Sequence, residues 1–124
     1  MSSIELTIPT HFTTKELNCP CNCGLETDRS FLLQLENLRR VLDIPLLINS
    51  GARCADYNKD VGGVDGSYHV VSRAVDIKCL SSDLRFHLIK TALNLGFSGI
   101  GIHKRFIHLD DRNRTGEPEK CWLY

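Results

Sequence analysis

Hydrophobic residues recur at helical spacing in two long segments of the chain. Between Asp28 and Asp43 apolar residues recur mostly three or four positions apart, and charged residues lie between them. The apolar residues are Phe31, Leu32, Leu35, Leu38 and Leu42. This spacing gathers apolar side chains on one face of a helix. The segment from Ser82 to Leu95 repeats the pattern and is followed by Gly96, a residue typical of helix C-termini. We therefore predict two amphipathic helices, each with one face in the core.

Two segments in the middle of the chain have the pattern of β-strands. Residues 74–78 alternate, so that Val75 and Ile77 face one side and Asp76 the other. The apolar run 46–48 ends in a polar turn and predicts a short buried strand. Asp76 is therefore expected to point away from the core.

A hairpin is predicted near the C-terminus. Residues 99–103 and 106–110 are separated by a two-residue turn, and the glycines of the first segment allow close approach of a neighbour. Period two sends His108 and Asp110 to the same face of the second strand. These two side chains are therefore expected to be neighbours.

The remaining segments predict turns and loops. Residues 13–16 have the Ser/Thr-x-x-Glu form of a capping box, which predicts a short helical turn. Residues 55–66 are rich in Asp, Asn and Gly and predict a long surface loop, a type that is often functional. Residues 117–120 predict another loop, and residues 122–124 an aromatic tail that packs back on the domain.

Composition places these elements in one domain over residues 1–124, because a chain of this length forms a single core. Lys and Arg number 15, as do Asp and Glu, so charge gives no reason to expect a nucleic-acid or acidic-membrane partner. The N-terminus lacks the pattern of a signal peptide, and no stretch is long and apolar enough to span a bilayer. We expect a monomer that is cytoplasmic when synthesised.

Six cysteines complicate the assignment of a compartment. Cys19, Cys21 and Cys23 lie close together, and the other three are far apart in sequence. An even count suits disulfides in a secreted protein, but without an export signal buried or reduced thiols are expected. Structural zinc sites space their cysteines by two to four residues, so this cluster is a weak metal motif, and if it binds metal a distant Cys121 must help.

The strongest chemical pattern joins His69, Asp76 seven residues later, and His108. Two imidazoles and one carboxylate suit a zinc ion and leave its fourth position to water, as a metal hydrolase requires. His11 and His87 have no comparable context and are expected on the surface or on a helix face.

The same residues carry a family resemblance. The segment 67–76 resembles the Ser-x-His-x-x-x-x-Ala-x-Asp signature of the zinc D-alanyl-D-alanine carboxypeptidase group, and 106–110 resembles its closing metal motif. The group includes phage L-alanyl-D-glutamate endopeptidases, D,D-dipeptidases and the hedgehog signalling domain. The resemblance implies a small α+β fold with a mostly antiparallel central sheet and helices packed on it. It also implies zinc, with three ligands: His69, Asp76 and His108.

The resemblance implies further roles around the metal. Arg53 matches an arginine that grips a substrate carboxylate or carbonyl, a task that suits the forked guanidinium. Ser67 and Tyr68 are candidates for hydrogen bonds to the substrate or to the metal ligands, although Tyr68 fits simple packing equally well. These three residues are therefore candidates for substrate binding.

The general base is less well defined. Several relatives place an acidic residue shortly before the final metal histidine, whereas here residues 102–106 contain no carboxylate. Asp110 could accept a proton from the metal-bound water, or could instead orient His108. His103 is the other candidate, as a proton shuttle or as a donor to an oxyanion.

The resemblance implies a zinc peptidase that hydrolyses peptidoglycan stem peptides, in the manner of a phage or prophage endolysin. Its bond would be L-alanyl-D-glutamate or D-alanyl-D-alanine. Two rival interpretations stay open: a non-catalytic zinc-binding recognition module, as the hedgehog relatives suggest, and a virion-associated protein that degrades the wall locally.

Overall fold

A five-stranded sheet forms the centre of the molecule in a computed structural model that describes residues 11–124. The helices are α2 (Thr14–Leu17), α3 (Arg29–Leu42), α4 (Ala55–Asp60), α5 (Ser82–Asn94) and the 3-10 turn η1 (Arg112–Thr115). The strands are β1 (Ile48–Ser50), β2 (Ala74–Lys78), β3 (Gly99–Ile102), β4 (Phe106–Asp110) and β5 (Lys120–Leu123). The prediction of a missing signal peptide concerns residues outside the described part of the chain. No helix of the described residues is both long and apolar enough to cross a membrane.

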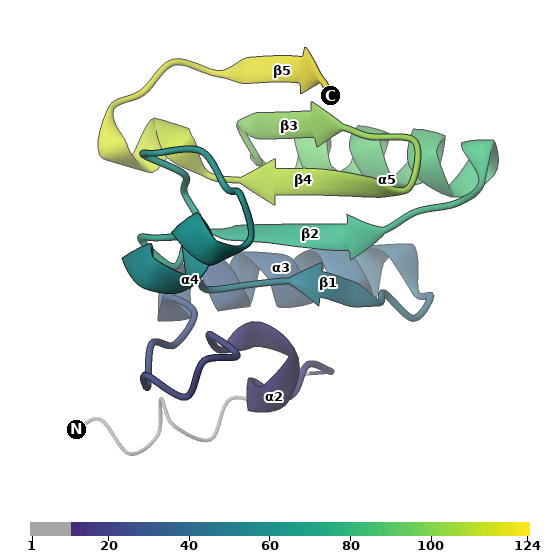
Figure 1. Cartoon of the computed structure of the whole chain (residues 1–124). Helices are drawn as coiled ribbons and strands as arrows, with labels where there is room; N and C mark the ends of the chain where they lie inside the picture. Colours follow the sequence, from purple (N-terminus) through teal and green to yellow (C-terminus); the bar gives the residue numbers. More distant parts are fainter. Residues whose placement is uncertain (1–10) are drawn as a thin grey trace.

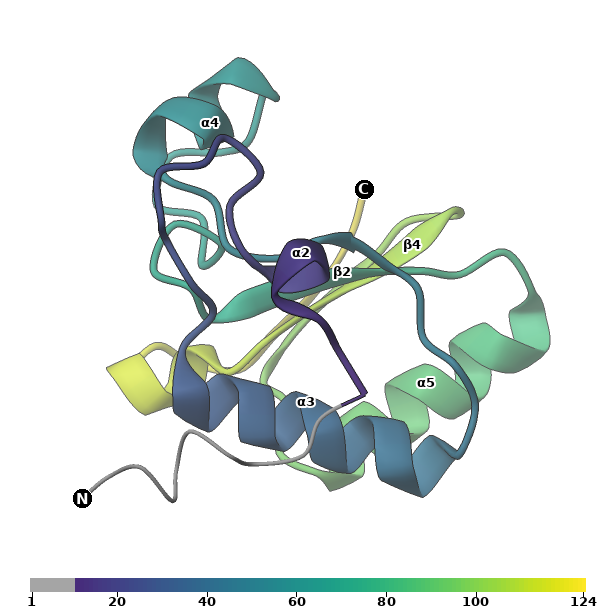
Figure 2. The same cartoon turned by 90° about the horizontal axis from the view of Figure 1, so that it is seen from below.

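The sheet has the strand order β1-β2-β4-β3-β5, and only the β3–β5 pair is parallel (Figure 1). Helices α3 and α5 cover one face, whereas α4 lies on the other side (Figure 2). The predicted α+β fold with a mostly antiparallel sheet and helices packed on it is therefore confirmed.

The core lies between the sheet and the two long helices. Alternation along β2 and β4 turns four fully buried side chains toward them: Val75, Ile77, Ile107 and Leu109. Helix α3 contributes Phe31, whose ring meets that of Phe97 edge to face with centroids 5.8 Å apart. Both predicted long helices are confirmed, since the apolar stripe of each supplies residues to this core.

Capping residues define where these helices begin and end. The Asp28 carboxylate accepts the backbone N–H groups of Ser30 and Phe31 at the start of α3, and Asp43 ends the helix in a left-handed conformation with φ of 53°. The predicted capping box at residues 13–16 is also present and starts α2.

One prediction for an irregular segment was wrong, and another is confirmed and extended. Residues 55–66 are not a loop throughout, because they begin with α4, whose first turn is capped by the Cys54 sulfur. The aromatic tail packs on the domain as predicted, and its Trp122 and Leu123 do so as part of strand β5 beside β3. A parallel partner lies far away in sequence and has no local signature, so the pattern of the tail alone could not reveal it.

The predicted close approach at the glycines of β3 is confirmed. A Cβ atom at Gly101 would lie 2.8 Å from the Trp122 ring, and one at Gly99 would collide with the Asp110 carboxylate. Only glycine therefore lets β3 lie between these two side chains.

Candidate metal and active site

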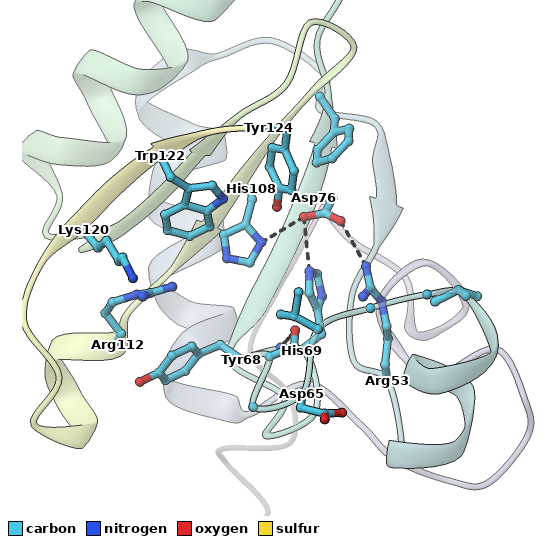
Figure 3. A pocket seen from close by; sticks show the side chains of 17 residues that line it. Arg53, Asp65, Tyr68, His69, Asp76, His108, Arg112, Lys120, Trp122 and Tyr124 are labelled. Carbon is cyan, nitrogen blue, oxygen red and sulfur yellow. Dashed lines mark hydrogen bonds and ion pairs between the residues drawn. The ribbon is translucent and has the colours of Figure 1, made fainter.

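Three side chains from separate parts of the chain converge on the face of the sheet opposite α3 and α5 (Figure 3). Asp76 on β2 is directly opposite His108 on β4 in the antiparallel register, and His69 comes from the turn before β2. Asp76 Oδ1 lies 3.1 Å from His69 Nε2 and 3.1 Å from His108 Nδ1. The structure thus brings together the three predicted metal ligands, all of them buried.

A backbone carbonyl fixes the orientation of the His69 ring. Its Nδ1 lies 2.6 Å from the carbonyl oxygen of Gly51. A carbonyl oxygen only accepts hydrogen bonds, so Nδ1 carries the hydrogen, and in the neutral ring Nε2 keeps a bare lone pair. That lone pair is directed at Asp76 Oδ1.

A carboxylate fixes the His108 ring in the same way. Its Nε2 lies 2.7 Å from Asp110 Oδ2, which leaves Nδ1 facing Asp76. The predicted proximity of His108 and Asp110 is confirmed. A carboxylate behind a histidine is the usual means of holding a metal-binding imidazole in one tautomer.

These orientations provide a test of whether a metal fits. Two neutral imidazoles would turn bare nitrogens toward a carboxylate oxygen, and such an arrangement is repulsive unless a cation or added protons lie between them. Two imidazole nitrogens and one carboxylate oxygen are a donor set that zinc accepts, with a fourth position left open. The three residues therefore fit a divalent zinc ion.

The electrostatics of the site also favour a bound cation. Burial by itself would raise the pKa of Asp76, but hydrogen bonds with His108 and His69 outweigh it and hold this pKa well below its ordinary value. Burial would lower the pKa of His108, but hydrogen bonds with Asp110 and Asp76 raise it overall. Asp76 is therefore ionised, and its negative charge attracts a cation to the site.

Arg53 holds the other oxygen of Asp76. Its guanidinium donates to Asp76 Oδ2 at 3.2 Å, to Ser50 Oγ at 2.9 Å and to Asn58 Oδ1 at 3.0 Å. Its backbone N–H also donates to the carbonyl of His69 at 2.9 Å. A guanidinium has five N–H donors, so two are left for a ligand. Arg53 therefore braces the metal ligands and can still bind a carboxylate.

The three converging residues line a pocket of about 560 Å³. Three cationic side chains line it as well, namely Arg53, Arg112 and Lys120, against two carboxylates, Asp65 and Asp76. The rest of the wall is formed by the loop that follows α4 and by aromatic rings. The described pocket is therefore open to a peptide and carries more positive than negative groups.

Tyr68 belongs to an aromatic and cationic wall of this pocket. The Arg112 guanidinium lies 4.8 Å from the Tyr68 ring and 4.8 Å from the Trp122 ring, between the two. The Tyr68 hydroxyl lies 3.3 Å from Thr115 Oγ1. Ser67 Oγ accepts the backbone N–H of His69 at 3.2 Å and so shapes the turn that carries this ligand.

Asp110 and His103, the two candidates for proton transfer, do not line the pocket themselves but lie behind residues that do. Asp110 is fully buried and contacts His108 Nε2 and the Arg112 guanidinium. Burial would raise its pKa, but these hydrogen bonds lower it to about 2. The His103 ring stacks on Phe106 with centroids 4.5 Å apart, at the tip of the hairpin.

Five charged or aromatic pocket residues were not singled out from the sequence: Asp65, Arg112, Lys120, Trp122 and Tyr124. Three of them lie on or directly after β5, which reaches the pocket by its parallel pairing with β3. The Tyr124 hydroxyl points toward Asp76 in Figure 3. Burial and the nearby Asp76 charge raise the Tyr124 pKa, so this residue stays a hydrogen-bond donor at neutral pH. The aromatic content of the tail was the one available signal.

A family model described as Peptidase M15 matches residues 10–110. The chain belongs to the peptidase M15 family. The match includes Arg53 and all three converging metal donors, and β5 lies beyond it. A search of curated proteins finds no match to this M15 chain. Membership supports a peptidase, and the donor set supports metal binding.

Proposed function

We propose that this M15 protein is a zinc-dependent peptidase that hydrolyses peptidoglycan stem peptides. The observation that carries the proposal is the orientation of His69 and His108. Each ring is fixed from behind, by Gly51 and Asp110, and each directs its other nitrogen toward Asp76 at the pocket. An open three-ligand site at a peptide-sized pocket is the arrangement that metallopeptidases use.

A zinc ion bound here would polarise the scissile carbonyl and make the bound water a nucleophile at neutral pH. The protein's own groups would perform the remaining tasks. Arg53 would hold Asp76 in place while its remaining N–H groups bind the substrate. Asp110 would act as a positioning residue, because it contacts His108 on the side away from Asp76.

The charge of the pocket supports an anionic peptide as substrate. Asp76 and Asp110 pair with Arg53 and Arg112, but Lys120 adds an exposed positive charge to the lining, and the remaining N–H groups of Arg53 are suited to bind a carboxylate through two parallel hydrogen bonds. Stem peptides have free carboxylates close to both candidate bonds, namely the α-carboxylate of D-glutamate, whose side chain continues the peptide, and the carboxylate of the terminal D-alanine. We propose that Tyr124 donates a hydrogen bond to the carbonyl oxygen that becomes negative during attack.

One observation favours a second candidate, a non-catalytic zinc-binding recognition module. Among the described residues, the carboxylates lining the pocket are Asp76 and Asp65. Asp65 is exposed on the loop after α4, on the far side of His69 from Asp76 in Figure 3. Apart from Asp76 itself, no carboxylate of the lining is therefore placed beside the metal donors to accept a proton from a bound water. A recognition module does not need such a base.

The two candidates are separated by incubating zinc-loaded protein with two defined stem peptides. One ends in D-alanyl-D-alanine, and the other retains the L-alanyl-D-glutamate bond but lacks the terminal D-alanine. New amino groups and product masses are measured for the wild type, for His69→Ala and for His87→Ala, a matched control in which an exposed histidine of α5 is removed. The proposal expects release by the wild type and the control and none by His69→Ala. Binding of peptidoglycan that depends on His69, without any release, would establish the recognition module instead.

A further inference from the structure

A second group of metal-binding side chains lies outside the pocket, at the junction of the loop after α2 and the start of α4. Its sulfur atoms all lie within 4.8 Å of one another, and they belong to Cys19, Cys21, Cys23 and Cys54. The expectation that a distant Cys121 must complete this group was wrong, because Cys121 is exposed on β5 and Cys54 takes the fourth place.

Backbone conformation explains how cysteines separated by single residues can converge. Asn22 and Gly24 both adopt left-handed conformations, with φ of 67° and 90°. The backbone N–H of Cys19 donates to the carbonyl of Leu25 at 3.0 Å, which closes the loop on itself. The chain therefore reverses tightly enough for alternate residues of the loop to turn their sulfurs toward one centre.

We propose a second, structural zinc site whose ligands are the thiolates of Cys19, Cys21, Cys23 and Cys54. The sulfurs of Cys21 and Cys19 are 3.4 Å apart, as are those of Cys21 and Cys54. Sulfurs around a tetrahedral zinc ion with Zn–S bonds of about 2.3 Å lie about 3.8 Å from one another, so these two separations need only a slight expansion, and all pairs of the group lie within 4.8 Å. Four protein ligands close the coordination shell and leave no position for water or substrate.

Backbone hydrogen bonds to sulfur support the binding of thiolates here. The N–H of Cys54 donates to the Cys19 sulfur at 3.3 Å, and the N–H of Tyr57 donates to the Cys54 sulfur at 3.4 Å. Donors aimed at sulfur offset the negative charge of a zinc ion bound to four thiolates. Binding forms four Zn–S bonds and releases the thiol protons to solvent, with no change of oxidation state.

Disulfides are the competing state of these thiols, and the geometry disfavours them. Four cysteines allow three pairings, and two of those pairings join residues only two positions apart, either Cys19 with Cys21 or Cys21 with Cys23. The observed separations of 3.4 Å exceed the length of about 2.05 Å of a disulfide bond. One common centre accounts for all four sulfurs, whereas any disulfide pairing splits them into two pairs.

The proposed ion would support the active site from outside it. Cys54 directly follows Arg53, and Ala52 donates its backbone N–H to the carbonyl of Leu17 at 2.8 Å. A metal bond from Cys54 to the loop after α2 would therefore fix the backbone on both sides of Arg53. The site differs from the M15 metal site in its donors and in its location, so it does not depend on the proposed peptidase activity.

Metal content of the intact chain, purified in the presence of zinc, tests the proposal. We expect two zinc ions per chain in the wild type and one in Cys21→Ser. Cys121→Ser is the matched control, because it removes an exposed thiol outside the group, and it should keep two. His108→Ala should keep one. An equal zinc content in Cys21→Ser and Cys121→Ser would overturn the proposal, whatever the peptidase assay shows.

Two measurements avoid any misfolding of the cysteine variants. Titrating the wild type with an organic mercurial, which blocks thiols, should release one zinc ion per chain to a chromogenic chelator. Cobalt added to the metal-free His108→Ala chain should give the intense charge-transfer absorption of cobalt–thiolate bonds. Absence of that absorption, or intact-mass evidence of disulfides among these cysteines in protein purified with zinc, would contradict the site.

Discussion

The two candidate metal sites of this protein are built on very different parts of the fold. The His69, Asp76 and His108 site lies on paired strands, where Asp76 is opposite His108 in the register and all three side chains are buried. The cysteine group lies on loops and at the first turn of α4, and Cys21 and Cys23 are exposed. One site is therefore positioned by the sheet, and the other only by short local contacts.

The two sites therefore differ in whether the fold needs the metal. Strand pairing, Gly51 and Asp110 hold the imidazoles in place without any ion, so metal removal should leave that part of the fold intact. The loop of residues 19–23 belongs to no strand and has few buried apolar side chains, so an ion there would contribute to folding directly.

Removing a metal donor should have the largest effect on activity and little on the fold. His108→Ala is expected to lower peptidase activity to background, since an open three-ligand site cannot lose a donor and hold its metal. The thermal midpoint of the metal-free variant should stay close to that of the metal-free wild type. Activity assays and thermal unfolding, with His87→Ala as control, measure both. Full activity in His108→Ala would refute the assignment of this ligand.

Removing a cysteine donor should have its main effect on the stability of the fold. Cys21→Ser is expected to lower the free energy of unfolding by more than about 3 kcal/mol, because loss of a structural metal is among the largest single-site effects. Cys121→Ser should change it by less than about 0.5 kcal/mol, as is usual for an exposed position. Denaturant titration of zinc-loaded protein gives both values. Equal stabilities for the two variants would remove the contrast between the sites.

Variants of Asp110 test whether the sheet alone is enough to orient the His108 ring. Asp110→Ala is expected to weaken zinc binding about 10-fold to 100-fold while leaving it measurable, as for other residues behind a metal-bound histidine. Asp110→Asn keeps an oxygen that can accept from Nε2 and should recover part of the affinity. Competition with a zinc chelator measures this difference. Undetectable binding in both variants would mean that Asp110 has more than a positioning role.

Tyr124 tests the part of the pocket that β5 contributes. Tyr124→Phe removes only the hydroxyl and is expected to lower kcat about 100-fold with little change in zinc content, because one neutral donor to the oxyanion is lost. Steady-state kinetics on the hydrolysed stem peptide, with zinc content measured in parallel, provide the check. A change in KM alone would assign the hydroxyl to substrate binding.

The smallest expected effect is on acid stability, and it comes from a carboxylate that belongs to neither group of metal donors. Burial would raise the pKa of Asp28, but hydrogen bonds from Ser30 and Phe31 and the charge of Arg73 lower it overall. Because the folded pKa lies below the unfolded one, this carboxylate stabilises the fold above the unfolded pKa of about 3.9 and loses that effect as pH falls. Asp28→Asn should therefore flatten the fall of the thermal midpoint between neutral pH and about pH 3. An unchanged slope would contradict this contribution.

The sequence was most informative where local periodicity and chemistry coincide. Alternation in residues 74–78 and 106–110 predicted strands whose outward side chains include Asp76 and His108, and the structure pairs them. Helical spacing likewise predicted both long helices. Their caps agree with the predicted ends to within about one residue.

Contacts between distant segments were harder to predict. Tyr124 reaches the pocket through a parallel pair of strands, and Cys54 joins the other cysteines across more than thirty residues of chain. Neither position has a local pattern, because such contacts depend on how whole elements pack. The prediction from cysteine spacing, that single-residue gaps make a weak metal motif, did not consider the left-handed residues that turn the loop.

Anomalous diffraction at the zinc absorption edge, from crystals of zinc-loaded protein, can show whether His69, Asp76 and His108 hold an ion together. We predict a peak within bonding distance of three atoms: His69 Nε2, Asp76 Oδ1 and His108 Nδ1. We also expect a water molecule to complete the coordination of that ion. Zinc-loaded crystals without a peak between these side chains, or with a fourth protein ligand closing the site, would refute this metal site.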